Sequence, residues 1–454
     1  MQKRMQRLLL NTISYIERIS SVPFCESAVL CALHDLEDYS IYAGCDEIYL
    51  SIIQSVVRHY NMKKDGASVV SLLSGLKKHT LNYQAIMYVD FIILRQTHWG
   101  TMKPLIDAFI ESKCHVRIIP TPMIQEKQDH WGKALSKIIQ QDGYTVQNFE
   151  QYDIEKALPD IVIDNMAVDC AKIPEFRFLR VASLVDNTVH IEHSILTGYN
   201  EAMKRSRFRL GRSRCWQYVV PSPLFSISFP LIFRIDGEYL PMGCPELDSI
   251  YSSQAEHIKR CKVFSSVLWN VDALDPDTEI PGDYERLAKE IEYLEAMAQS
   301  YPDIIQIVRK HPNFCNQKKC EQLSKTLDNL ICSYDNIRYD TNKLIYETYK
   351  EIDAMVTWMS SSTLFSFAAT GKPIIVMPTF IDGGYDTMLD MYLLSVIPVA
   401  FSLKDMYNFF DNMKADVNKK TRIEVLQKYT GPLDGNASKR IAEEVLIRYD
   451  RFFD

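Results

Sequence analysis

The chain has 454 residues and a mass of 52.5 kDa, about three times the usual size of one domain, so we expect at least two domains. Hydrophobic residues make up 47% and charged residues 24%, which is typical of a globular protein and excludes fibrous and low-complexity classes. The formal net charge of -7 argues against a general nucleic-acid binder, which is normally basic.

The first residues and the cysteines bear on the cellular compartment. Residues 1–10 place only three leucines after the charged start, too few for a secretory signal, and no apolar run approaches the ~18 residues of a transmembrane helix. The cysteines are irregularly spaced without a Cys-x-x-Cys pair, which is typical of free thiols in a reducing compartment. We therefore expect a cytoplasmic protein, with peripheral contact at the inner face of the cell membrane as an open option.

Residues 1–80 show helical periodicity with few turn signals. Apolar residues recur there at helical spacing, as at Ile13, Ile16 and Ile19. The basic residues at positions 3–7 fit a solvated helix start better than a lipid contact. These patterns predict a helical N-terminal extension.

From about residue 81 the chain changes to short apolar runs that alternate with helix-like segments. Strands are predicted at residues 85–94, 115–119, 160–163 and 189–193. Short apolar strands between helices favour a parallel sheet that helices cover on both faces. We assign residues 81–235 to a first Rossmann-like domain.

The same pattern restarts after residue 236. Strands are predicted at residues 239–242, 263–269, 304–308, 354–357 and 373–378, and polar helices at residues 283–300 and 318–330. We assign residues 236–430 to a second Rossmann-like domain and residues 431–454 to a closing helix. The predicted fold is therefore α/β, with two doubly wound domains that face one cleft and a helical N-terminal extension.

Polar residues that follow strands are the first site candidates, because open α/β sheets bind ligands beyond the carboxyl ends of their strands. His193 ends a predicted strand, where it would either accept a proton from a hydroxyl or only bond to loop backbone, and the sequence favours neither. Arg309, Lys310 and His311 follow another strand, and they suit a phosphate or pyrophosphate better than a plain surface turn.

Two further clusters carry polar chemistry. The run Ser360–Ser362 stands between a strand and a helix, and because one hydroxyl suffices to cap a helix, the run favours a phosphate cradle. A basic run that includes Arg207, Arg209 and Arg212 fits a phosphate-rich acceptor, an anionic membrane surface or a solvated loop. Nucleic acid is a weaker reading, since no aromatic ladder accompanies these charges.

Several common motifs are absent from the sequence, namely Walker A, Gly-x-Gly-x-x-Gly, Gly-x-Ser-x-Gly and His-Glu-x-x-His. Their absence disfavours P-loop ATPases, common dehydrogenases, common lipases and zinc proteases. The cysteines have no matching histidine pair, so no metal site is predicted.

An ordered set of short motifs runs through residues 84–430. The set comprises His98-Trp99, residues 116–122, residues 152–154, residues 159–162, His193, residues 242–248, Leu268-Trp269, residues 309–312, Ser360–Ser362, residues 371–373, and Asp382 with Tyr385. In this order and spacing they resemble the CDP-glycerol glycerophosphotransferase family of teichoic-acid and capsule synthesis. That family is similar to nucleotide-sugar glycosyltransferases with two Rossmann-like domains, the GT-B arrangement.

The resemblance implies transfer of glycerol phosphate, or in relatives ribitol phosphate, from a CDP-linked donor with release of CMP. It implies that His193 is the base that takes the acceptor proton and that His311 neutralises charge on the donor pyrophosphate. It also implies that Ser360 and Ser361 lie near the donor phosphates. The first Rossmann-like domain would then hold the acceptor and the second domain the donor.

The remaining site predictions concern contacts to phosphate and to the acceptor. Donor-phosphate contacts are also predicted at Arg309, Lys310, Ser362 and Asp382. Contacts to the acceptor or to a membrane surface are predicted at His98, Arg207, Arg209 and Arg212. No cofactor and no metal are required, because fixed donors and cations supply the charge stabilisation. The expected partners are a nucleotide-activated donor and a lipid-linked or polymeric acceptor, with no nucleic acid.

The chain departs from the family pattern at two positions. Ser194 stands where the family usually has glycine, and Trp358 stands where it has an acidic residue. The leading hypothesis is a cytoplasmic transferase that moves a polyol phosphate to a hydroxyl of a surface-polymer precursor. The alternatives are a GT-B glycosyltransferase that uses a nucleotide sugar and a non-catalytic nucleotide-binding partner in polymer export.

Overall fold

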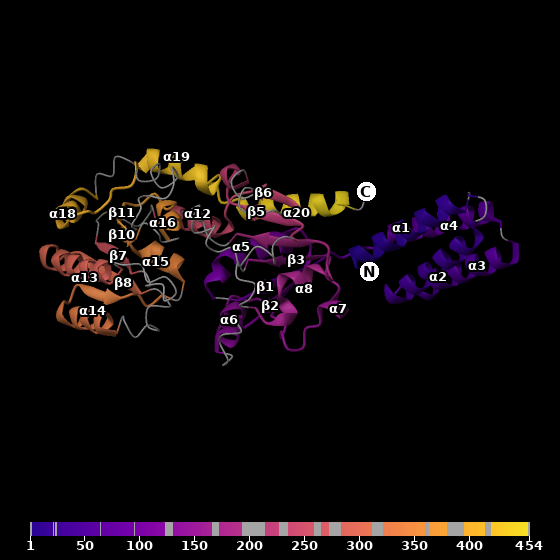
Figure 1. Ribbon diagram of the computed structural model, residues 1–454, viewed down its shortest axis with the longest axis horizontal. Helices are drawn as coiled ribbons and strands as arrows, with labels where there is room; N and C mark the ends of the chain where they lie inside the picture. Colours follow the sequence, from indigo (N-terminus) through magenta and orange to yellow (C-terminus); the bar gives the residue numbers. More distant parts are fainter. Residues whose placement is uncertain are drawn as a thin grey trace.

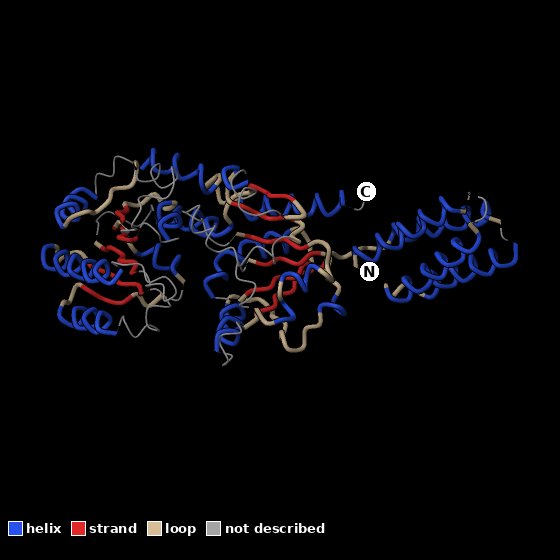
Figure 2. Tube along the Cα trace, in the orientation of Figure 1, coloured by secondary structure: helices blue, strands red, loops and turns tan. Residues whose placement is uncertain are grey.

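The computed structural model describes residues 2–20, 22, 25–63, 65–94, 96–122, 130–165, 172–192, 214–226, 235–257, 265–271, 283–310, 321–342, 344–358, 363–378, 395–413 and 419–452. Within these residues the chain forms a helical bundle and two α/β units, each built on its own sheet (Figure 1, Figure 2). No helix in these ranges is long and apolar enough to cross a membrane.

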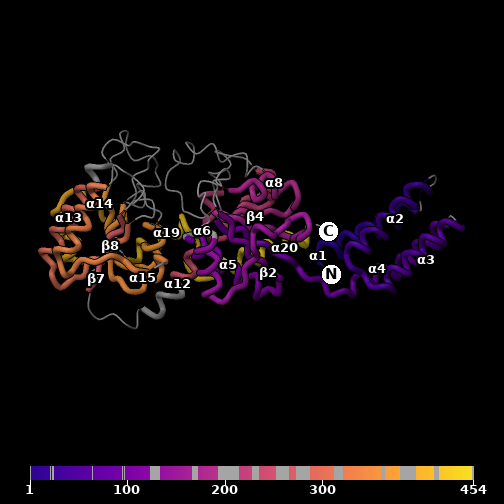
Figure 3. The backbone as a smooth tube through the Cα atoms, turned by 90° about the horizontal axis from the view of Figure 1, so that it is seen from below, coloured from indigo at the N-terminus to yellow at the C-terminus, as the bar shows by residue number. Residues whose placement is uncertain are grey.

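Four helices form the N-terminal bundle: α1 Lys3–Ile19, α2 Glu26–Tyr42, α3 Glu47–Lys63 and α4 Gly66–Asn82. Each helix buries residues spaced three and four apart, such as Leu9, Ile13 and Ile16 in α1, because this spacing lines one face of a helix. The bundle projects away from both sheets (Figure 3). The predicted helical extension is confirmed.

The bundle joins the first α/β unit at the start of α1. The carboxylate of Asp160 is fully buried there and accepts hydrogen bonds from the backbone amides of Arg4 (2.6 Å) and Tyr88 (2.7 Å). It also accepts a bond of 2.7 Å from the hydroxyl of Tyr449. Segments from the beginning, the middle and the end of the chain therefore meet at one side chain.

The first sheet has six parallel strands in the order β2-β1-β3-β4-β5-β6. The strands are β1 Tyr88–Ile93, β2 His115–Pro120, β3 Ile161–Asp164, β4 Thr188–Ile191, β5 Gln217–Val220 and β6 Glu238–Pro241. One face is covered by α5 Gln96–Glu111, α6 His130–Gln141 and α20 Ala437–Phe452. The other face is covered by α7 Ile154–Ala157, the 3-10 helix Pro174–Phe176 and α8 Phe178–Ala182.

Two strands of this sheet differ from the sequence prediction. Residues 239–242 are predicted to begin the second unit, yet they form most of β6, in which Tyr239 pairs with Tyr218 of β5. That prediction is wrong, because a short apolar run does not specify which sheet it joins. The strand β5 itself is not predicted, since four residues are too few for a clear pattern.

The second sheet has five parallel strands in the order β11-β10-β7-β8-β9. The strands are β7 Ser266–Val271, β8 Ile305–Lys310, β9 Ile337–Tyr339, β10 Ala354–Trp358 and β11 Ile374–Met377. One face is covered by α13 Asp283–Ser300, α14 Glu321–Ser333 and α18 Leu403–Asn412. The other face is covered by α12 Pro245–His257, α15 Ile345–Glu351, α16 Thr363–Ala368 and α19 Lys419–Thr430.

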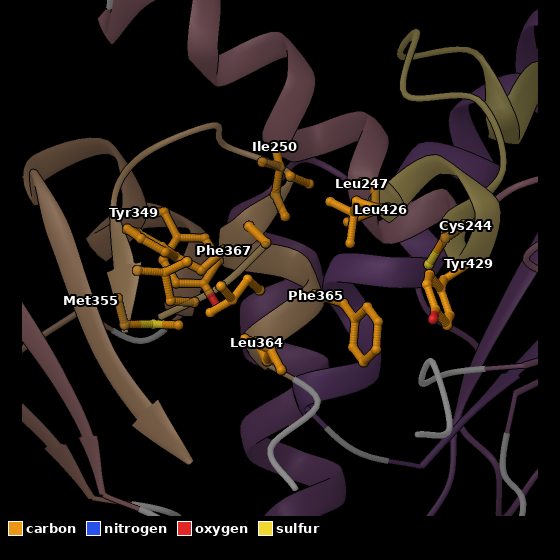
Figure 4. Packing of buried hydrophobic residues seen from close by; sticks show 14 of the residues in the cluster. Cys244, Leu247, Ile250, Tyr349, Met355, Leu364, Phe365, Phe367, Leu426 and Tyr429 are labelled. Carbon is orange, nitrogen blue, oxygen red and sulfur yellow. The ribbon is translucent and has the colours of Figure 1, made fainter. Parts of the chain in front are cut away.

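Helix α12 lies at the junction of the two α/β units. Its Leu247 packs with Phe365 of α16 and Leu426 of α19 in the core of the second unit (Figure 4). The same helix contacts α5 and α20 of the first unit. The predicted fold class, two doubly wound α/β units behind a helical extension, is confirmed.

Candidate functional site

The candidate site lies beyond the carboxyl ends of the strands, where parallel sheets bind ligands. Most of the predicted site residues lie outside the described part of the chain: His193, Arg207, Arg209, Arg212, His311, Ser360, Ser361, Ser362 and Asp382. Their roles stay predictions. His98, Arg309 and Lys310 are described, and each lies at or just after the carboxyl end of a strand.

His98 lies in the first turn of α5, directly after β1. Its side chain is 4% exposed, because α5 packs the neighbouring Trp99 and Met102 into the core of the first sheet. A side chain this deeply buried does not lie on a surface that meets a membrane. Its predicted contact with an acceptor stays a prediction.

Arg309, near the end of β8, is held by an acidic side chain from another segment. Its Nη1 donates to Oδ2 of Asp340 at 2.5 Å and to the backbone oxygen of Asn342 at 3.0 Å. Asp340 accepts a further bond of 2.6 Å from the hydroxyl of Thr348 in α15. The guanidinium is thus fixed against the segment that follows β9, and a bound phosphate would have to share it with this carboxylate.

Lys310, the next residue, is held on the α14 side of the sheet, because successive strand residues point to opposite faces. Its Nζ donates to Oδ1 of Asp328 at 2.9 Å and to the hydroxyl of Ser324 at 3.1 Å, and it lies 4.6 Å from the ring centroid of Tyr339. Arg309 and Lys310 are therefore not brought together on one side of the sheet.

A hydrogen-bonded triad orders the start of α16. Nδ2 of Asn270 in β7 donates to the hydroxyl of Thr357 in β10 at 3.2 Å and to that of Thr363 at 2.9 Å. Thr363 is the first residue of α16 and directly follows the run Ser360–Ser362. The triad ties this helix start to two central strands. Asn270 was missed from sequence, although an amide inside an otherwise apolar strand is a signal that could have found it.

Trp358, which replaces an acidic residue of the resembled family, faces the core. Its Nε1 donates to Oε2 of Glu290 in α13 at 2.6 Å, and both side chains are 1% exposed. The indole therefore fills space between β10 and α13. Trp358 is the last residue of β10, but its side chain packs in the core instead of extending beyond the strand end.

A buried row of titratable side chains crosses the first sheet, from the carboxyl end of β3 to the middle of β5. The pairing register places Asp164, His190 and Tyr218 side by side on β3, β4 and β5, and each is at most 2% exposed. The ammonium of Lys172 pairs with Asp164, and it is 1% exposed. The hydroxyl of Tyr218 donates to Oε2 of Glu192 at 2.5 Å.

Such side chains are costly to bury unless they are paired. Asp164, His190 and Glu192 lie at or next to the carboxyl ends of β3 and β4, so we include the row in the candidate site. Sequence reasoning missed it because its members lie in separate strands. The alternation His190-Ile-Glu192 was the only local signal. Within the described ranges, no group of three or more His, Cys, Asp and Glu side chains could hold a metal ion.

Comparisons with known proteins identify the fold. No family profile and no curated protein match the chain. The structure is similar to a putative UDP-N-acetylglucosamine 2-epimerase from Listeria monocytogenes, with 12% identity, a TM-score of 0.57 and coverage of 81% of this chain and 98% of that chain. It is also similar to the UDP-GlcNAc 2-epimerase of Methanocaldococcus jannaschii, with 14% identity, a TM-score of 0.55 and coverage of 80% and 100%.

A third similar structure is the wall teichoic acid polymerase TagF, with 13% identity, a TM-score of 0.50 and coverage of 89% of this chain and 99% of that chain. At these identities the likeness shows the fold alone. The protein has two Rossmann-like domains in a GT-B-like arrangement, as the sequence predicts.

Proposed function

We propose that the protein is a transferase that takes its group from a nucleotide-activated donor. The GT-B-like fold supports this proposal, because solved structures with the same fold include an epimerase in complex with UDP-GlcNAc and UDP and a wall teichoic acid polymerase. The buried titratable row on the first sheet and the Asn270 triad on the second also support it, because both include polar groups near the carboxyl ends of strands.

The specific reaction that we propose is transfer of glycerol phosphate, or a related polyol phosphate, from a CDP-linked donor to a hydroxyl of a surface-polymer precursor. The observation that carries it is the coincidence of two independent findings. The ordered motifs resemble the CDP-glycerol glycerophosphotransferase family, and the fold matches the teichoic acid polymerase over 89% of this chain.

In this reaction the acceptor oxygen attacks the phosphorus that carries the polyol, the bond from that phosphorus to the bridging oxygen breaks, and CMP leaves. His193 would take the acceptor proton, and His311 with Arg309 would offset charge on the leaving group. Ser360 and Ser361 would bind the donor phosphates at the helix start that Thr363 anchors. Phosphoryl transfer of this kind needs mainly positioning and electrostatic stabilisation.

Two alternatives make different predictions about the nucleotide product. A GT-B glycosyltransferase would release UDP or another nucleoside diphosphate from a nucleotide sugar. A non-catalytic partner in polymer export would bind a nucleotide without turnover.

The test is a donor screen of the purified protein with CDP-glycerol, CDP-ribitol and UDP-GlcNAc, in the presence of a lipid-linked glycerol phosphate acceptor. We expect CMP from a CDP-linked donor, and a drop of roughly 10²-fold or more in turnover for His193→Ala. Release of UDP from UDP-GlcNAc would replace the proposal with the first alternative. Nucleotide binding without any product would replace it with the second.

A further inference from the structure

The two α/β domains are in close contact at a glycine. Gly100 lies in α5 of the first domain, and a β-carbon at this position would be 2.1 Å from Cε2 of Tyr346 in α15 of the second domain. The tyrosine ring therefore occupies the space that a side chain at position 100 would need. The contact exists only because this helix position carries no side chain.

The same tyrosine is bonded to the junction helix. The hydroxyl of Tyr346 donates to the carboxylate of Glu246, which lies in the first turn of α12 and is partly buried. Since α12 also contacts α5, the ring of Tyr346 is held by both elements of the domain junction.

One turn further along α15, Tyr349 holds the helix of the candidate donor site. Its hydroxyl lies 2.8 Å from Oγ of Ser366 and 3.5 Å from the backbone oxygen of Thr363, both in α16. Its ring packs edge-on against Phe367, with 5.2 Å between the centroids (Figure 4). The hydroxyl of Thr348 between these two tyrosines bonds to Asp340, the partner of Arg309.

We propose that α15 couples the contact between the two domains to the position of α16, with Tyr346 and Glu246 as the positioning residues. On one side α15 contacts the first domain at Gly100 and the junction helix α12 at Glu246. On the other side it holds the start of α16 and the arginine at the end of β8. A change in the domain contact then shifts the groups beside the candidate donor site without any residue of the first domain touching a donor.

The carboxyl of Glu246 makes this contact sensitive to pH. Burial raises its pKa to about 7, against an opposing effect of the hydrogen bond from Tyr346. The titratable and charged groups around it are Cys244 and Asp248 on its own segment, Tyr346 and Tyr349 on α15, and Arg440 of α20 beside Asp248. On α5 the facing residue is Gly100, with His98 half a turn before it.

The sign of the pH effect follows from the direction of this shift. The ordinary pKa of the group is 4.5, so the folded protein binds the proton more tightly than the unfolded chain. The contribution of Glu246 to the domain contact is therefore fully present at low pH and is lost as pH rises from about 4.5 through about 7. A glutamine at this position mimics the protonated form and should abolish this dependence.

Hydrogen exchange of the free protein tests the coupling, and it needs no donor, so its outcome is separate from that of the proposed function. We expect Gly100→Ala and Tyr346→Phe each to speed the exchange of the α16 amides by about tenfold or more, because the hydrogen bond between Tyr346 and Glu246 is lost or displaced. The matched controls are Gly75→Ala in α4, where a β-carbon meets nothing within 4 Å, and Tyr83→Phe, which removes a bond to the exposed Asp46. Both controls should leave α16 unchanged.

The outcome that overturns the coupling is unchanged exchange in α16 for Tyr346→Phe, which removes only one hydroxyl and folds even if Gly100→Ala does not. A second comparison addresses the pH dependence. Protection of α15 and α16, corrected for intrinsic exchange, should fall between pH 5.5 and pH 8 in the wild type but not in Glu246→Gln, roughly the window of a group with a pKa near 7. An equal fall in both proteins would show that Glu246 is not the pH-sensitive group.

Discussion

Replacement of Asp160 by alanine should detach the N-terminal bundle from the rest of the protein. This carboxylate accepts three hydrogen bonds of 2.6–2.7 Å, from the amides of Arg4 and Tyr88 and from the hydroxyl of Tyr449. The tyrosine hydroxyl is buried and would be left without its acceptor, whereas the two partly buried amides would regain some bonds to water. Each unsatisfied donor costs about 1–3 kcal/mol, so we expect the free energy of unfolding to fall by about 3–4 kcal/mol.

The loss should have a local signature. Asp160 holds the start of α1 through the backbone amide of Arg4. Without this bond the bundle is held less firmly, so the connection at residues 83–87 between α4 and β1 should be cleaved rapidly by a protease. Urea unfolding followed by tryptophan fluorescence measures the global loss, and limited proteolysis measures the local one. Asp153→Ala is the matched control, since Asp153 also accepts bonds from two amides, but at an exposed position where water replaces them.

The pH dependence of this site gives a further check. Burial raises the pKa of Asp160 despite the bonds from Tyr88, Tyr449 and Arg4, so the folded state binds its proton more tightly than the unfolded chain. Its contribution to stability falls as pH rises from about 4 through the folded pKa. The stability gap between the wild type and Asp160→Asn should therefore narrow with rising pH. Equal proteolysis of Asp160→Ala and Asp153→Ala would refute the reasoning.

Three further predictions test the sheets and the site. Arg117→Met leaves the carboxylate of Asp90, which is 1% exposed, without its bidentate partner. Urea unfolding should show that the free energy of unfolding falls by about 3–5 kcal/mol, and by less at pH 5 than at pH 8, because a protonated Asp90 needs no cationic partner. Gly371→Ala forces a side chain into a left-handed conformation with φ of +70°, and the unfolding free energy should fall by about 1–2 kcal/mol; no change would mean that the turn relaxes. Asn270→Ala removes the bonds to Thr357 and Thr363, so calorimetric titration should show about tenfold weaker CDP binding, and unchanged affinity would exclude the triad from the donor site.

Much of the secondary structure follows from local patterns in the sequence. The spacing of Ile13, Ile16 and Ile19 predicts a helix that buries one face. In the structure α1 contains all three residues, with Ile13 and Ile16 in the core of the bundle and Ile19 packed against it. Short apolar runs between helices predict the buried parallel strands, and residues 283–300 form a helix with the predicted bounds. Both kinds of signal depend on neighbours within a few residues, which is why the sequence alone predicts the fold class.

The partners of these elements depend on contacts between distant parts of the chain. Residues 239–242 have the pattern of a strand, but only the tertiary structure places them at the edge of the first sheet. The row of Asp164, His190 and Tyr218 arises from pairing register, which no single strand encodes. Periodicity specifies which face of an element is buried, whereas the packing of the whole chain decides what that face meets.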